Sequence, residues 1–213
     1  MSSSIFNHRN QAPMSESEWM RTYKIGDAFL HESKFLVDGL TVRVEEIEAR
    51  WPTFSTEERL EFALAFSAKP GLTPEDVRVL DFLLEAGERY VWSTVAALLP
   101  RHPDKERALG FLLKMIGNEE RYDANFFHAL ERINDKRAIP AIKTAYDTYR
   151  RKLDGLADRR SACDAVGYMS CCKALWALEG SANYKDAIEE FLKSDDKAVC
   201  RFAEIMLFGE RPR

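Results

Sequence analysis

Apolar residues recur at helical spacing along most of the chain, and short polar breaks separate the periodic stretches. After Thr73, for example, Val77, Leu80 and Leu84 fall three or four residues apart, which places them on one face of a helix. The same pattern predicts helices that begin near residues 16, 39, 55, 73, 88, 103, 121, 134, 159, 184 and 196. Residues 1–14 are polar and lack this pattern, so we expect a disordered tail there.

Capping residues mark several of the predicted helix starts. Ser55 precedes Glu58 by three positions, as in a capping box, where each side chain bonds the backbone N–H of the other residue. Thr73 is followed by Pro74, which suits the first position of a helix because that position needs no backbone N–H donor. A weak strand-like alternation at residues 40–44 leads into a glutamate-rich run that favours helix. The chain is therefore predicted to be all-α.

The spacing of the helix starts indicates a repeat. Every second start, at residues 55, 88, 121, 159 and 196, is separated from the next by 33, 33, 38 and 37 residues. This is the length of one helical hairpin in solenoid proteins. Because one hairpin cannot bury its apolar stripe alone, neighbouring hairpins are expected to stack and join their stripes into one core.

Three segments resemble parts of HEAT-like repeats. Residues 130–142 (LERINDKRAIPAI) resemble the turn between the two helices of a repeat: an apolar helix end, an Asp turn, a cation, small apolar residues and Pro. Residues 194–207 look like a degenerate start of a first helix, because Cys200 separates the Val and Arg that are adjacent in that family. Residues 176–180 (WALEG) resemble the end of another first helix. The resemblance covers about residues 121–208 and is weaker over residues 55–116.

The resemblance implies an armadillo-type, right-handed α-α superhelix, a solenoid of HEAT-like helical hairpins, in a single domain over residues 15–213. Residues 15–54 would form a helical N-terminal cap and residues 55–213 the repeats, whose second helices would line an exposed concave face. In the turn, Asp135 would cap a helix start, and Pro140 would lie in the first helical turn. The following Arg137 would lie against the Asp of the next repeat.

The overall composition narrows the class of function. A net charge of −4 and a pI near 5.7 argue against a general nucleic-acid binder. The four cysteines show no CxxC spacing and no disulfide framework, which favours a reducing compartment, with the cytoplasm as the default. No segment has the apolar length of a signal peptide or of a membrane span, so we expect no membrane association.

The sequence carries no motif typical of a catalytic or metal site. None of the four histidines has a second ligand at metal-binding spacing: His8, His31, His102 and His128. His31-Glu32 is a single pair, whereas the HEAT-like di-iron deoxyhypusine hydroxylases need several. Cys171 and Cys172 are adjacent and lie among apolar residues, which favours core packing. We therefore expect no enzymatic activity, no cofactor and no metal.

One stretch of the sequence holds the candidate partner-binding residues: Lys143, Tyr146, Tyr149, Arg150, Arg151, Arg159 and Arg160. The arginines belong to the densest basic cluster, which either binds an acidic partner or a phosphate backbone, or complements the dipole at a solvated helix end. Tyr146 and Tyr149 either contact a partner on the concave face or belong to the core stripe with Ile142 and Leu153. The sequence leaves both choices open.

The function that these patterns favour is a non-catalytic interaction module, or adaptor, that binds a protein or peptide partner on the concave face. One alternative is a HEAT-like alkylpurine DNA glycosylase, for which Trp51, Trp92 and Asp123 would supply the aromatic residues and the carboxylate. The acidic pI weighs against it. A bacterial immunity protein, or a lyase that acts on phycobiliproteins, would also fit the architecture. The tryptophans are otherwise expected to pack in the core or between repeats.

Overall fold

The structure, a computed structural model, describes residues 43–69, 71–118, 123–155 and 162–209. Within these ranges it consists of helices and turns and contains no β-strand, so the all-α prediction is confirmed. The α-helices are α3 (Val44–Arg50), α4 (Thr56–Ser67), α5 (Pro74–Ala86), α6 (Arg89–Val95), α7 (Lys105–Ile116), α8 (Ala124–Ile133), α9 (Ile139–Gly155), α10 (Ala162–Glu179), α11 (Ala182–Glu189) and α12 (Lys197–Phe208). Short 3₁₀ helices extend or connect them: η1 (Trp51–Thr53), η2 (Ala96–Arg101), η4 (Lys136–Ala138) and η5 (Glu190–Lys193).

Several predictions concern residues outside the described ranges. These are the tail at residues 1–14, the helix near residue 16, the two N-terminal histidines, and two of the candidate binding residues, Arg159 and Arg160. The helix predicted from residue 39 is described from Val44 onward.

Two predicted helices differ from the observed ones in detail. The helix expected from residue 88 is α-helical only to Val95 and continues as η2. The reason is Pro100, whose ring would meet the Ala96 carbonyl in an α-helix. The helix expected from residue 134 starts as η4 and becomes α9 at Ile139, with Pro140 in its first turn as predicted.

Capping side chains fix where α4 and α5 begin. The predicted capping box of α4 is present: the Ser55 N–H donates to Glu58 Oε2 (2.7 Å), and the Glu58 N–H donates to Ser55 Oγ (3.2 Å). Thr73 and Asp76 form a second capping box at the start of α5. Burial raises the pKa of Asp76, but hydrogen bonds from Lys69 and Thr73 outweigh it, and the net pKa is lowered. Asp76 therefore stays charged beneath the helix start.

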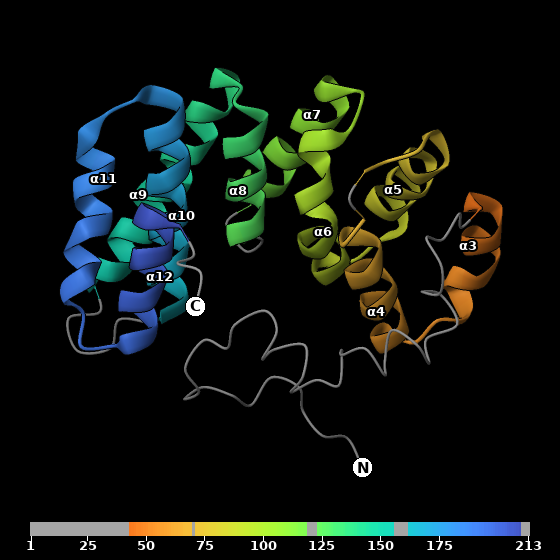
Figure 1. Cartoon of the computed structure of the whole chain (residues 1–213), viewed down its shortest axis with the longest axis horizontal. Helices are drawn as coiled ribbons and strands as arrows, with labels where there is room; N and C mark the ends of the chain where they lie inside the picture. The colour runs from red at the N-terminus through yellow and green to blue at the C-terminus, as the bar shows by residue number, and fades with distance from the viewer. Residues whose placement is uncertain (1–42, 70, 119–122, 156–161, 210–213) are drawn as a thin grey trace, which may run out of the picture.

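The helices pack in two rows that follow the order of the chain (Figure 1). In one row α4 contacts α6, α6 contacts α8, α8 contacts α10, and α10 contacts α12. In the other row α3 contacts α5 and α7 contacts α9, while Arg107 of α7 pairs with Asp81 and Glu85 of α5 (2.8 and 2.7 Å). The first row begins its helices at residues 56, 89, 124, 162 and 197, close to the predicted repeat.

The buried apolar side chains form two clusters. The larger cluster runs through α3 to α10, and the smaller one joins α9, α10, α11 and α12 at the C-terminal end. Tyr146, Tyr168 and Tyr184 are partly buried and pack against both clusters. These three tyrosines therefore lie where the last hairpin meets the rest of the stack.

The second-row helix α9 keeps one face toward solvent. It buries Ile142 and Ala145 and exposes Lys143, Asp147 and Arg150.

In the part of the chain that the structure describes, no helix is both long enough and apolar enough to cross a bilayer.

A close approach between α9 and α10 depends on Gly167. The Tyr149 side chain is buried, and its ring packs edge-on against Phe127, with centroids 6.5 Å apart. On its other side the ring lies over Gly167, where an added Cβ atom would stand 2.2 Å from Tyr149 Cζ. Only glycine leaves room for the tyrosine ring at this crossing.

We expect Gly167→Ala to lower the free energy of unfolding by about 1–3 kcal/mol, because the added methyl group overpacks the crossing. Gly110→Ala in α7 is the matched control, since no atom lies within 4 Å of its added Cβ. There the better helix propensity of alanine is expected to raise the free energy of unfolding by about 0.5–1 kcal/mol. Urea denaturation followed by circular dichroism measures both. Equal stability of the Gly167→Ala and wild-type proteins would contradict the close packing.

Candidate functional site

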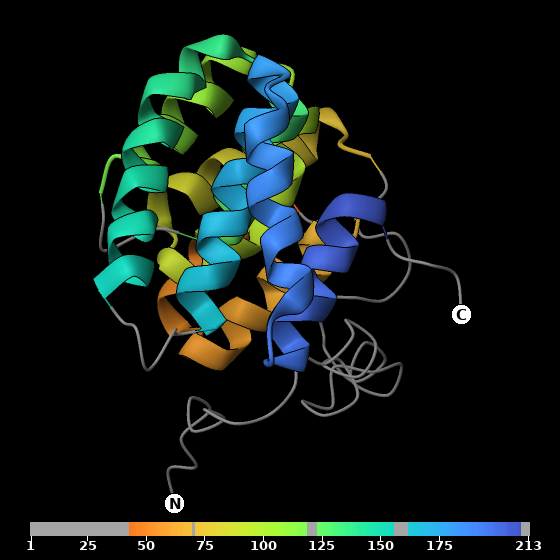
Figure 2. The same ribbon diagram turned by 90° about the vertical axis from the view of Figure 1, so that its left-hand side faces the viewer.

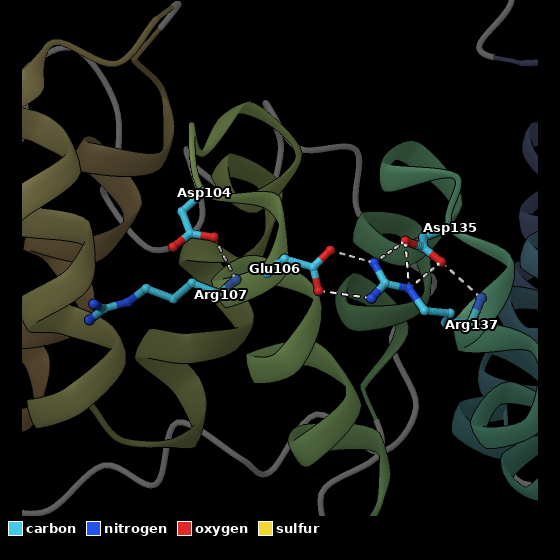
Figure 3. Close-up of polar contacts among 5 residues, drawn as sticks. All are labelled: Asp104, Glu106, Arg107, Asp135 and Arg137. Carbon is cyan, nitrogen blue, oxygen red and sulfur yellow. Dashed lines mark hydrogen bonds and ion pairs between the residues drawn. The ribbon is translucent and has the colours of Figure 1, made fainter.

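Ion pairs between successive hairpins form a ladder along the second row of helices. Figure 3 shows the pair between Arg137 and Glu106. Arg137 in η4 donates to both carboxylate oxygens of Glu106 on α7 (2.6 and 2.8 Å) and to Asp135 Oδ2 (2.6 Å). Arg107 is the next arginine toward the N-terminus and reaches back to α5 in the same way. The pair before it joins Arg78 of α5 to Glu45 of α3 (2.5 Å).

The ladder confirms one prediction for the turn and corrects another. Asp135 caps the turn, since its Oδ1 accepts the Arg137 N–H (2.9 Å). Arg137 was expected to lie against the Asp of the next repeat, but it pairs with Glu106 of the preceding hairpin, because η4 lies beside the start of α7. Hydrogen bonds from Arg137 lower the pKa of both carboxyl groups.

These ion pairs are exposed, and exposed pairs contribute little to stability. The charged groups of these pairs are also already bonded to one another within the chain. We therefore assign the ladder to the alignment of neighbouring hairpins.

A groove of about 400 Å³ opens between α9, α10 and α11. Its lining consists of aromatic, apolar and charged side chains: Tyr146, Arg150, Leu153, Asp154, Tyr168, Asn183, Asp186, Ala187, Glu190 and Phe191. Figure 2, which faces this end of the molecule, shows α10 between α9 and α11. The groove therefore has two helical walls and a floor to which α10 contributes.

Helical periodicity explains why these residues line the groove. The α9 wall presents Tyr146, Arg150 and Leu153, which are four and three residues apart and so share one face. The opposite wall presents Asp186 of α11 and Glu190, four residues later at the start of η5. Each wall is thus one continuous helix face, and a ligand between the walls contacts both.

Three tyrosines pack together beside the groove, and two of them, Tyr146 and Tyr168, line it. The rings of Tyr146 and Tyr168 stack with centroids 5.0 Å apart, and the Tyr168 hydroxyl donates to the Tyr146 oxygen (3.0 Å). Tyr184 meets Tyr146 edge-on at 5.7 Å. Burial, followed by the nearby Glu179 carboxylate, raises the pKa of Tyr184 to about 12, and burial also raises the pKa of Tyr168. Tyr168 and Tyr184 therefore remain neutral at physiological pH.

The structure separates the two tyrosines that the sequence left undecided. Tyr149 belongs to the core stripe with Ile142 and Leu153, which are also buried, so the core alternative is correct for this residue. Tyr146 is half-buried and lines the groove, so it contributes both to the core and to the surface.

The described cations among the candidate binding residues make separate contacts. Lys143 pairs with Glu179 of α10 (2.6 Å), and Arg150 lies on the groove wall, 4.0 Å from Asp154. Arg151 donates to the Asp147 carbonyl oxygen and to the Thr148 hydroxyl. Of the described candidates, the groove therefore includes Tyr146 and Arg150.

The groove also includes residues that the sequence analysis missed: Asp154, Tyr168, Asp186, Glu190 and Phe191. The one signal available in the sequence was the four-residue spacing of Asp186 and Glu190, which places two carboxylates on one helix face. That spacing is common on solvated helices, so it does not by itself indicate a site.

The residues nominated for a DNA glycosylase have structural uses. Trp51 is 5% exposed and packs against Phe62 and Phe82. Trp92 packs edge-on against Phe111, and the Asp123 carboxylate caps α8 by accepting the Asn125 N–H (2.9 Å).

The described part of the chain offers no clustered metal ligands. His102 is buried in a turn, where its Nδ1 accepts the Asp104 N–H (3.1 Å) and its Nε2 lies 3.2 Å from Asp81. Within the described ranges, His, Cys, Asp and Glu side chains form no group of three or more that could hold a metal ion.

Comparison of the chain with known protein families, with curated proteins and with solved structures gives no match in any of the three. The candidate site therefore rests on the geometry described above.

The buried cysteines yield a direct test of the packing around α10. Cys171 and Cys172 are fully buried, as predicted, and burial raises the pKa of both thiols, that of Cys172 to about 12. We expect a Cys163→Ser/Cys200→Ser protein to show no fast reaction with a thiol reagent in its native state, and two reactive thiols after denaturation. Wild type is the control, because Cys163 is exposed and reacts directly. A fast native phase in the double variant would show that α10 is less enclosed than described.

Proposed function

We propose that this chain is a HEAT-like solenoid that acts as a non-catalytic interaction module, or adaptor, and binds a protein or peptide partner in the groove between α9, α10 and α11. The two rows of helices support this architecture, with each first-row helix followed by its second-row partner. Contacts between residues about one repeat apart also support it: Trp51 packs against Phe82, and Asn125 donates to the Ser93 hydroxyl (2.9 Å). In a right-handed superhelix of this kind, α9 and α11 are second helices and contribute to the concave face.

The observation that carries the proposal is the composition and placement of the groove. Half-buried aromatic rings from α9 and α10 lie at its base, and exposed polar side chains surround them. Protein interfaces commonly combine an aromatic centre with a polar rim, and tyrosine is enriched among their energetically dominant residues. A volume of about 400 Å³ is large enough for one or two side chains of a partner segment.

The proposed compartment is the cytoplasm. All four cysteines are free thiols, and Cys171 and Cys172 are adjacent in the core without forming a bond. A reducing environment preserves this state.

We expect Ala187→Trp to weaken partner binding about tenfold, because the indole would fill the groove that Ala187 lines. Ala177→Trp is the matched control, since Ala177 is an exposed α10 residue outside the groove lining. The immobilised wild-type, Ala187→Trp and Ala177→Trp proteins are incubated with lysate of the source cells, and the bound proteins are quantified by mass spectrometry. The proposal predicts a protein that is recovered with wild type and Ala177→Trp and falls about tenfold with Ala187→Trp.

The purified partner is then titrated against all three proteins, with circular dichroism to verify folding. Partners that bind the Ala187→Trp protein as well as wild type would place the interaction outside the groove, and recovery of no specific protein by wild type would contradict the adaptor function.

A further inference from the structure

The charges around the groove are unequal. Asp154, Asp186 and Glu190 line it together with a single cation, Arg150. Arg150 is itself paired with Asp154 at 4.0 Å. Among the described residues, Asp186 and Glu190 take part in no ion pair, and the neighbouring Lys185 pairs with Glu189 instead (2.9 Å). The groove therefore presents two exposed carboxylates on the α11 wall that the described part of the chain does not neutralise.

The helix itself disfavours these two carboxylates. Asp186 and Glu190 are four residues apart, and like charges at this spacing repel each other and destabilise a helix. Glu190 also stands at the C-terminal end of α11, where the helix dipole places a partial negative charge. A cation between the two carboxylates relieves both effects, so the free groove favours a positively charged ligand.

The aromatic base of the groove favours the same kind of ligand. Tyr146 and Tyr168 are stacked at an interplanar angle of 29°, and Phe191 lies against Tyr168 with centroids 5.9 Å apart. Aromatic faces attract cations, and guanidinium groups also stack flat on them. An arginine side chain suits this combination better than lysine, because its planar group donates to two carboxylate oxygens while it stacks.

From this arrangement we infer that the groove binds an arginine side chain on a basic segment of the partner protein. The guanidinium group lies against Tyr146 and donates to Asp186 and Glu190, while the aliphatic stem covers the aromatic base. This inference rests on the proposed function and specifies the partner by its chemistry. The partner segment is therefore expected to be positively charged, whereas the basic residues of the sequence had suggested an acidic partner.

The test uses the full chain and three fluorescent nine-residue peptides of glycine and serine that carry arginine, lysine or citrulline at the same three positions. Fluorescence anisotropy measures their affinities at low and at high salt. We expect the arginine peptide to bind about tenfold more tightly than the citrulline peptide, which has the same shape without the charge, and more tightly than the lysine peptide. High salt is expected to reduce this preference.

A pair of charge-matched variants locates the binding. Asp186→Asn/Glu190→Gln is expected to weaken binding of the arginine peptide about tenfold. Glu48→Gln/Asp147→Asn removes two exposed carboxylates outside the groove lining and is expected to change the affinity less than about twofold. Circular dichroism verifies that both variants are folded. Equal weakening by the two pairs would mean non-specific attraction and would overturn the inference.

The outcomes for the arginine site and for the adaptor function are distinguishable. A partner that is lost with Ala187→Trp but binds Asp186→Asn/Glu190→Gln at full strength leaves the function in place and overturns the arginine site. Arginine and citrulline peptides of equal affinity overturn it as well. Arginine-specific binding that Asp186→Asn/Glu190→Gln weakens about tenfold, and that Glu48→Gln/Asp147→Asn leaves nearly unchanged, supports it, whether or not the lysate yields a partner.

Discussion

The structure depends on the burial of apolar faces between consecutive helical hairpins. Trp51 illustrates this, since it is enclosed by Phe62 of α4 and Phe82 of α5. Burying one large apolar side chain contributes about 1.5–3 kcal/mol, whereas an exposed ion pair contributes about 0–1 kcal/mol. Apolar contacts between neighbours therefore supply the stability, and the ladder that includes Arg137 and Glu106 adds directional contacts that favour one alignment of the hairpins.

Local features of the fold were predictable because the residues that encode them are close in sequence. The capping box of Ser55 and Glu58, and the cap by Asp135, each involve residues two or three positions apart. The partner of Arg137 was not predictable in the same way, because it depends on which neighbouring turn lies beside η4. The cap, the proline and the helix period determine where the turn lies in the chain, but they carry no information about the side from which the next hairpin approaches.

The groove was predictable only in part, since it requires three helices at once. Tyr146 and Tyr149 have equivalent positions in the apolar pattern of α9. Their different environments are due to two adjacent residues of α10. Gly167 leaves space in which the Tyr149 ring is buried. Tyr168 instead stacks its own ring on Tyr146, which stays partly exposed at the surface. The difference between a core tyrosine and a groove tyrosine is thus set by the residues of another helix, beyond the reach of periodicity within α9.

The position of the groove at one end of the stack has a consequence for its motion. Interactions such as those of Tyr146 with Tyr168 and of Lys143 with Glu179 join helices that are close in sequence. A chain with such contacts is expected to form its structure locally, one pair of neighbouring helices at a time. In the proposed solenoid each hairpin gains stability from its neighbours. Within the described ranges α11 and α12 pack against α10 on one side, so the proposed architecture predicts that they open at a lower free energy than helices packed on both sides. Because α11 forms one wall of the groove, the proposed recognition surface would then lie in the part of the molecule that unfolds locally more readily, and a bound segment that bridges α9 and α11 would keep these helices together.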